Sequence, residues 1–299
     1  MGEATPAWVT FLSDYGLDDS YVGVCTGVIA RLAPHTRVVD VCHAVPAQQV
    51  GQGAAILAGA VAYLPIGIHL GLVDPPAAVS ARAVAIRTAD GSTFVAPDNG
   101  LTSLAWGVLG GVTEARALDD PSLHLPDAHR MFRGRDVLSP VAARLSAGLP
   151  LAAVGSAVDP ASLVVVTPRK PKVDDDHVRG QVRGVDHFGN LSLNIERADL
   201  EAAGILLGDT VEVRMDGRTL LVPFRSTYGE VGVGRLAVCE DASRRIMLGV
   251  NLGRASDTLR ARRGDAVVIS QAPREPARPA EPIGLLEPPV GTATPAAQP

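Results

Sequence analysis

The feature that most constrains the fold is an alternation of two patterns along the first half of the chain. Short apolar, β-branched runs at Trp8–Leu12, Thr36–Cys42 and Ile68–Val73 predict buried strands. The segment Tyr21–Leu32 and the Ala-rich segment Gln48–Tyr63 predict helices, each of which ends before a proline. Strands separated by helices need crossover connections, so the alternation predicts a mostly parallel sheet with flanking helices.

The same half contains a predicted hairpin and two further helices. The hairpin joins strands Ala83–Thr88 and Thr93–Ala96 around an Asp90-Gly91 turn. The spacing of apolar residues predicts helices over Leu101–Leu109 and Val137–Ala147. We assign residues 1–166 to one α/β domain.

The pattern changes beyond residue 166. Residues 167–178 contain two prolines and a run of charges, which is typical of a linker. Residues 179–272 form short strand-like runs parted by glycines, with one helical piece at Ala198–Ala203, and they predict a small β-barrel domain. Residues 273–299 are rich in Pro and Ala and predict a disordered tail. The expected fold class is therefore α/β, with an N-terminal mostly parallel sheet and a C-terminal small β-barrel domain.

Composition narrows the range of partners. The 299 residues are 46% apolar and 20% charged, with a net charge of −5, whereas a general nucleic-acid binder is usually basic. Apolar runs are interrupted by Pro, Gly or polar residues before they reach membrane-spanning length, and the first ten residues lack the pattern of a signal peptide. The three cysteines are widely spaced and predict small buried side chains in a reducing, cytoplasmic setting.

Charged residues gather where predicted strands end. Asp14 and Asp74 each follow an apolar strand, and Asp98-Asn99 follows another. Because ligands bind at the carboxyl ends of strands in open α/β sheets, these carboxylates predict a pocket, with the arginines of "HRMFRGRDVLSP" beside it. Ordinary turns and helix starts remain the alternative for each loop taken alone.

The second half has one distinctive stretch, "VDHFGNLSLNI", at residues 185–195. It is either a hairpin turn, where Asp, Gly and Asn are common, or part of a site for an adenine-like ring. In the second case Phe188 would stack on the ring and Asn190 would form a hydrogen bond with its edge.

Several common catalytic and binding motifs are absent from the sequence. It contains neither a phosphate-binding glycine loop, nor a serine nucleophile elbow, nor a metal-binding histidine pair. His43 is expected to be a satisfied core or turn residue.

Six motifs in order resemble the S-adenosyl-L-methionine (SAM) hydroxide adenosyltransferases, a family that also includes fluorinating and chlorinating enzymes. They span roughly residues 7–272 and read "FLSDYGLDDSYVG", "VVDVCHAVPAQQV", "LVDP", "FVAPDNGL", "FRGRDVLSPVAA" and "VDHFGNLSLNI". The resemblance implies a homotrimer whose sites lie between the first domain of one subunit and the second domain of its neighbour. It implies SAM as the small-molecule substrate, and neither a nucleic acid nor a membrane as partner.

The resemblance also implies roles for individual residues. Asp14 matches the carboxylate that grips the ribose hydroxyls, and Asp186 matches a residue near the methionine ammonium. Phe188 and Asn190 match residues that line the adenine and methionine part of the site. The remaining substrate-binding candidates are Gln48, Asn99, Phe132, Gly134, Ser243 and Val250.

The implied reaction is substitution at the ribose 5′ carbon, with no metal or other cofactor. Hydrolytic members use an Asp, an Arg and a His around water, and halogenating members have a tyrosine at the Asp position. Asp74 stands at that position here, which favours hydrolysis to adenosine and L-methionine. The family's arginine falls on Ala81, with Arg82 one place later, and its histidine falls on Arg133. Arg82 and Arg133 are therefore the other two catalytic candidates.

Two alternatives stay open beside the hydrolase. Gly134 occupies the position of a halide-binding residue, and two arginines lie nearby, which would suit a halide (chloride) transferase; the negative charge of Asp74 opposes it. The altered triad would also suit a protein that binds SAM or adenosine with lost or weak catalysis, because an arginine stays protonated and cannot act as a base.

Overall fold

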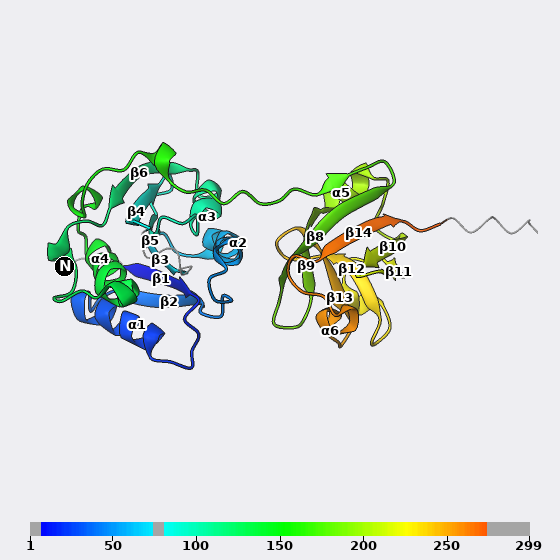
Figure 1. Cartoon of the computed structure of the whole chain (residues 1–299), viewed down its shortest axis with the longest axis horizontal. Helices are drawn as coiled ribbons and strands as arrows, with labels where there is room; N and C mark the ends of the chain where they lie inside the picture. Colours follow the sequence, from blue (N-terminus) through cyan, green and yellow to red (C-terminus); the bar gives the residue numbers. More distant parts are fainter. Residues whose placement is uncertain (1–6, 74–80, 274–299) are drawn as a thin grey trace, which may run out of the picture.

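The computed structural model describes residues 7–73 and 81–273. Asp74 and the predicted tail, apart from Pro273, lie outside these residues. The described chain forms two parts, which a single crossing segment joins (Figure 1). The fold class predicted from the sequence is confirmed: a mostly parallel sheet with helices is followed by a nearly closed antiparallel barrel.

The first part is a six-stranded sheet in the order β2-β1-β3-β5-β4-β6. Strands β2, β1, β3 and β5 are mutually parallel, whereas β4 is antiparallel to both of its neighbours. The strands are β1 (Trp8–Ser13), β2 (Arg37–Cys42), β3 (Ile68–Leu72), β4 (Ala83–Thr88), β5 (Thr93–Pro97) and β6 (Val112–Ala117). Strand β6 was missed in the sequence because it carries charged residues and is only partly buried.

Helices cover both faces of this sheet (Figure 1). Helices α1 (Tyr21–Leu32) and α4 (Ser139–Ser146) pack on one face through a core that includes Val9, Phe11 and Leu70. Helices α2 (Val50–Ala60) and α3 (Ser103–Val108) cover the other face. A π-helical turn at Gly134–Leu138 precedes α4, so the helix predicted over Val137–Ala147 begins within an irregular turn.

The second part is an antiparallel sheet in the order β11-β10-β14-β8-β9-β13-β12, with β7 paired to β8. The two edge strands in this order are β11 and β12. A bridge between Phe224, just after β11, and Val238 in β12 brings them together, so the sheet is almost closed. Its strands are β7 (Lys172–Val173), β8 (His177–Val185), β9 (Leu191–Glu196), β10 (Thr210–Met215), β11 (Arg218–Pro223), β12 (Leu236–Glu240), β13 (Arg245–Val250) and β14 (Ala266–Gln271). Two short helices, α5 (Arg197–Ala202) and α6 (Ala255–Leu259), accompany them.

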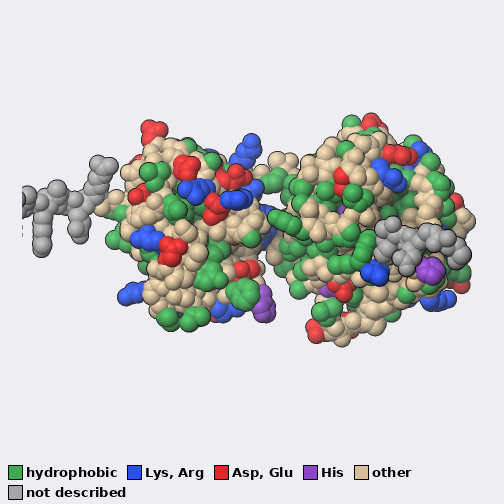
Figure 2. All heavy atoms as spheres, turned by 180° about the vertical axis from the view of Figure 1, so that it is seen from behind, with side chains coloured by type: hydrophobic (Ala, Val, Ile, Leu, Met, Phe, Trp, Pro, Cys, Tyr) green, Lys and Arg blue, Asp and Glu red, His purple; other side chains and the backbone are tan. Residues whose placement is uncertain are grey.

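The segment expected to be a linker carries regular structure at its end. Strand β7 lies within residues 167–178, and β8 begins at His177. The side chain of His177 contacts both Asp174 and Asp176, which places part of the aspartate run against the barrel. On the face that Figure 2 shows, acidic and basic side chains lie close together over the barrel. The barrel part also carries ion pairs such as Arg197–Glu201 and Arg244–Glu240.

Candidate functional site

The carboxyl ends of the parallel strands meet at one edge of the first sheet. Asp14 follows β1, His43 follows β2, and Asn99 follows β5. Because β4 runs antiparallel to β5, with Ala83 opposite Pro97, the start of β4 lies at this edge as well and places Arg82 there. Asp74 comes two residues after β3 and lies outside the described residues.

The Asp14 carboxylate is half-buried and accepts a hydrogen bond from the backbone N–H of Gln48, over 2.9 Å. Burial raises the pKa of this carboxyl, and the Gln48 bond opposes the shift. The following helix, α1, begins after Ser20, whose side chain makes no capping hydrogen bond. Asp14 is therefore not the capping residue of α1, and its carboxylate lies at the strand edge with the Gln48 N–H as a protein donor.

Gln48 and Asn99 shape the backbone around this edge. Gln48 has a φ of 66°, in the left-handed region, and this conformation accompanies the N–H bond to Asp14. The Asn99 amide donates to the carbonyl of Val73 over 2.7 Å and accepts from the backbone N–H of Leu101. Asn99 thus ties the end of β3 to the loop after β5.

An aromatic group lies beside Asp14. The rings of Tyr15, Tyr21 and Phe132 contact one another with centroids 5.3–5.9 Å apart. Gly134 lies under the Tyr15 hydroxyl, so close that a Cβ atom there would overlap that oxygen and would also lie 2.9 Å from the Cδ1 atom of Leu72. Because Gly134 has no side chain, the Tyr15 hydroxyl can occupy this position.

We expect Gly134→Ala to disturb the site and destabilise the fold. Overpacking of this kind costs about 1–3 kcal/mol, because Tyr15 or Leu72 must shift. Gly27→Ala in α1 is the matched control: a Cβ there meets nothing within 4 Å, so this change is expected to stabilise the helix by about 0.5–1 kcal/mol. Chemical denaturation measures both, and equal stabilities for the two variants would contradict the packing described here.

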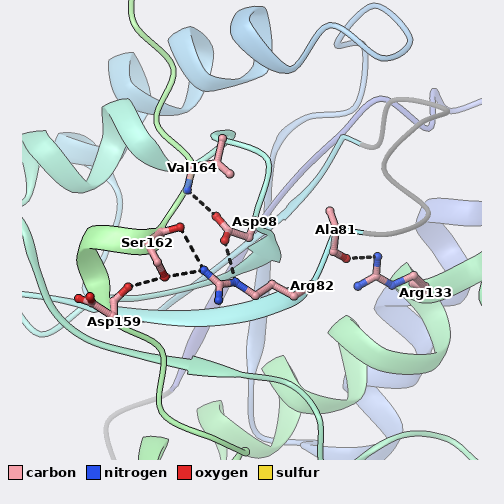
Figure 3. Close-up of polar contacts among 7 residues, drawn as sticks. All are labelled: Ala81, Arg82, Asp98, Arg133, Asp159, Ser162 and Val164. Carbon is pink, nitrogen blue, oxygen red and sulfur yellow. Dashed lines mark hydrogen bonds and ion pairs between the residues drawn. The ribbon is translucent and has the colours of Figure 1, made fainter.

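Arg82 is bound on the side of β4 that faces away from Arg133 (Figure 3). Its Nε donates to Asp98 over 2.8 Å, and its Nη2 donates to the Ser162 hydroxyl over 2.8 Å. Asp98 also accepts from the backbone N–H of Val164. Arg82 and Asp98 therefore fasten the segment that leaves the first part of the chain.

Arg133 lies on the opposite side and donates to the carbonyl of Ala81 over 2.7 Å (Figure 3). It lines a cavity of about 240 Å³ together with Ala81, His129, Arg130 and Val137. The two catalytic arginine candidates are thus separated in the structure. Arg133 donates to the carbonyl of Ala81, whereas Arg82 donates to Ser162 on the other side.

We expect Arg82→Ala to reduce stability. The Asp98 side chain is only 6% exposed, and losing the partner of a buried acceptor costs about 1–3 kcal/mol. Arg82 itself is partly exposed, which places the expected loss toward the lower end. Arg197→Ala, which breaks an exposed pair with Glu201, is the control and is expected to cost about 0.3–0.5 kcal/mol. An Arg82→Ala protein no less stable than Arg197→Ala would contradict this role.

The barrel carries a second group of candidates around a cavity of about 480 Å³. Three of the candidates line it together: Phe188 and Asn190 from the turn between β8 and β9, and Val250 from the end of β13. Phe188 is 70% exposed, so its ring is available for stacking. Other lining residues include Tyr228, Leu252 and Arg254, which the sequence did not single out because they follow no recognisable motif.

Asp186 supports this cavity through the turn between β8 and β9. Its carboxylate accepts from both the backbone N–H and the side-chain amide of Asn190, each over 2.8 Å. Gly189 has a φ of 83°, and a Cβ there would lie 2.7 Å from the Cβ of Arg254. The stretch is therefore a hairpin turn, and that turn presents Phe188 and Asn190 to the cavity.

Ser243 lies apart from this group, on the exposed turn between β12 and β13. Its backbone N–H donates to Asp241, and its hydroxyl oxygen lies 3.6 Å from where a Cβ of Gly59 in α2 would be. Ser243 thus contacts the first part of the chain rather than the cavity that Phe188 lines.

Two further findings bear on partners. Within residues 7–73 and 81–273, no group of three His, Cys, Asp or Glu side chains could hold a metal ion. Over the same residues, none of the helices has the length and apolar character needed to cross a membrane.

Both parts of the chain match domains of one known protein family. The chain matches the SAM hydroxide adenosyltransferase N-terminal domain over residues 9–155 and the C-terminal domain over residues 180–268. An (R)-S-adenosyl-L-methionine hydrolase of Salinispora tropica is 41% identical and covers 89% of this chain and 99% of its own. A fluorinase of Nocardia brasiliensis is more distant, at 28% identity over 79% of this chain and 87% of its own.

A solved structure extends the agreement to the whole fold. The crystal structure of an uncharacterized conserved protein from Thermotoga maritima is 34% identical, with a TM-score of 0.81 over 88% of this chain and 100% of its own. Both parts of the chain, and the motifs at the strand edge and the barrel turn, are accounted for by one family. The chain therefore belongs to the SAM hydroxide adenosyltransferase family.

Proposed function

We propose that this protein hydrolyses SAM to adenosine and L-methionine. The observation that carries the proposal is the 41% identity, over nearly the full length of both chains, to a protein named as an (R)-S-adenosyl-L-methionine hydrolase. The fluorinase relative is considerably less similar, which favours water over halide as the nucleophile.

In the proposed reaction, an oxygen of water or hydroxide attacks the ribose 5′ carbon. The bond from that carbon to sulfur breaks, and the electron pair stays on sulfur as the neutral thioether of methionine. A proton is released from the attacking oxygen. Because a sulfonium is already a good leaving group, the protein chiefly has to hold the two reactants in line and remove excess water, and no cofactor is required.

Asp14 is proposed to bind the ribose hydroxyls through its second carboxylate oxygen. Its position supports this role, because the other oxygen is fixed by Gln48 and the carboxylate is partly withdrawn from water. Gln48, Asn99, Phe132 and Gly134 are proposed to shape the same end of the pocket.

The adenine and methionine ends are proposed to lie against the barrel cavity. Phe188 would stack on the adenine ring, Asn190 would bond to its edge, and Val250 would line the floor. Asp186 would contribute negative charge near the methionine ammonium, and Ser243 is proposed to contribute from the β12–β13 turn.

Asp74 is proposed to orient the attacking water, and Arg133 and Arg82 to supply positive charge around it. Arg133 already holds the carbonyl of Ala81, and Arg82 is bound by Asp98 and Ser162, so both would act through fixed charge rather than proton transfer. We further propose a cytoplasmic homotrimer, in which the strand edge of one subunit faces the barrel cavity of its neighbour.

One observation favours a second candidate, a protein that binds SAM or adenosine with weak turnover. The two arginines are engaged by other groups of the chain, and Ala81 and Arg133 replace the arginine and histidine that the family pattern would place there. Such a protein would keep the Asp14 and barrel contacts but lack efficient activation of water.

The test is product analysis after the purified protein is incubated with SAM, with and without chloride. Adenosine and L-methionine in amounts that chloride does not change would support hydrolysis. A 5′-chloro nucleoside would instead indicate a halide transferase. Saturable binding of adenosine without any product would indicate the binding protein.

A further inference from the structure

A chain of hydrogen bonds runs beneath the turn that carries Asp14. The hydroxyl of Ser13 lies 2.7 Å from Nδ1 of His43, and Nε2 of His43 lies 3.0 Å from a carboxylate oxygen of Asp40. The backbone N–H of Tyr15 donates to the same Ser13 hydroxyl over 3.3 Å. The chain thus begins on an exposed carboxylate and ends on the residue that follows Asp14.

For a neutral His43 ring, the partners fix the direction of every hydrogen in this chain. Asp40 can only accept when ionised, so Nε2 of His43 carries the hydrogen and donates it. In the neutral ring Nδ1 is then an acceptor, and the Ser13 hydroxyl donates to it. This leaves the Ser13 oxygen free to accept from the N–H of Tyr15. Of the two neutral tautomers, only this one satisfies all three bonds at once.

Ser13, His43 and Asp40 are the same three residue types as in a serine hydrolase triad, but they are connected differently. In such a triad the serine bonds Nε2 and the carboxylate bonds Nδ1, whereas here the two are exchanged. Ser13 is completely buried, and His43 packs edge-on against Phe11 with centroids 4.7 Å apart. The hydroxyl therefore cannot reach a substrate, and the chain has a different task.

That task follows from what surrounds Asp14. The N–H of Asp14 donates to the carbonyl of Leu72, and the N–H of Gly16 donates to the carbonyl of His43. Backbone groups on both sides of Asp14 are therefore held by Leu72 at the end of β3, by His43 just after β2, and by the Ser13 hydroxyl at the end of β1. The carboxylate is then held from a third direction by Gln48.

We propose that Ser13 and His43 are positioning residues, which hold the backbone at Asp14 so that its carboxylate meets the ligand's vicinal hydroxyls in fixed geometry. The proposal rests on the proposed role of Asp14 in binding the nucleoside. Neither side chain touches the ligand, so their effect on binding must pass through Asp14.

A double-mutant cycle on adenosine affinity tests this coupling. Ser13→Ala removes the shared hydroxyl and is expected to weaken adenosine binding about tenfold, the usual effect of one buried hydrogen bond. Added to Asp14→Asn, the same change is expected to have no further effect, because the group it positions is no longer a carboxylate. Calorimetric titration of the four full-length proteins with adenosine measures the cycle.

The same strand supplies a matched control. The Thr10 hydroxyl lies 2.8 Å from Nδ1 of His69, an equally buried bond between β1 and β3, away from the strand edge. Burial lowers the pKa of His69 to about 4, so this ring is neutral near pH 7. Thr10→Val is expected to lower the melting temperature without changing the adenosine Kd. If it weakens adenosine binding as much as Ser13→Ala, the effect is general destabilisation and the proposal is wrong.

A second pair of variants covers the case in which Ser13→Ala folds poorly. His43→Asn offers an amide oxygen near the former Nδ1 and is expected to bind adenosine close to wild type, whereas His43→Leu fills the space without an acceptor and is expected to bind about tenfold more weakly. Equal affinities for these two variants would overturn the proposal. So would additive effects of Ser13→Ala and Asp14→Asn. If Asp14→Asn itself leaves adenosine affinity unchanged, it is the assigned role of Asp14 that fails.

Discussion

Asp14→Asn is expected to weaken adenosine binding by between about tenfold and a hundredfold, the range that loss of hydrogen bonds to a charged group produces. Asparagine keeps the shape of the side chain, and its oxygen can still accept from the N–H of Gln48. It lacks the charge and the second acceptor that the ribose hydroxyls would use. Calorimetric titration with adenosine measures the change, and an unaltered Kd would remove Asp14 from the binding site.

The same substitution is expected to make the protein more stable at neutral pH. Burial raises the folded-state pKa of Asp14, so the fold disfavours the ionised carboxylate. This cost is absent below the unfolded-state pKa and appears as the pH rises through the folded-state pKa. Asp14→Asn should therefore have a higher melting temperature than wild type at neutral pH, and the difference should fade in acid. Opposite effects on stability and on affinity would separate binding from folding.

Asp74→Asn is expected to lower kcat for SAM hydrolysis by at least about a hundredfold, the usual contribution of a positioned base. If Asp74 orients water and does not grip the nucleoside, KM should change little. Asp14→Asn serves as its counterpart, because that change should act mainly on KM. Full hydrolytic activity in Asp74→Asn would show that another group, or none, handles the attacking water.

The sequence predicted the strands of the first sheet well because their patterns are local. The run at Trp8–Leu12 became β1, and the runs at Thr36–Cys42 and Ile68–Val73 became β2 and β3, each within one residue at either end. The carboxyl ends of parallel strands must share an edge, so the position of Asp14 at that edge followed from topology, whereas its bond to the Gln48 N–H did not. The π-helical turn at Gly134 had no local signal, because it depends on how Tyr15 and Leu72 pack against it.

The partners of the candidate residues could not be predicted in this way. Arg82 bonds Ser162, which lies 80 positions away, and no periodicity connects them. The orientation of a guanidinium at a strand start depends on which acceptor the tertiary fold brings near it. His43 was expected to be a satisfied turn or core residue, and it is one; its bond to Ser13 depends on how β1 and β2 align.

The most direct test of the proposed reaction is to supply SAM to the protein in water enriched in oxygen-18. Attack of water on the ribose 5′ carbon places the heavy oxygen in the adenosine product and leaves methionine unlabelled. Mass spectrometry of the separated products is therefore expected to find label in the 5′ hydroxyl of adenosine alone. Adenosine without label, label in the amino-acid product, or no adenosine above the level without protein would contradict hydrolysis at this carbon.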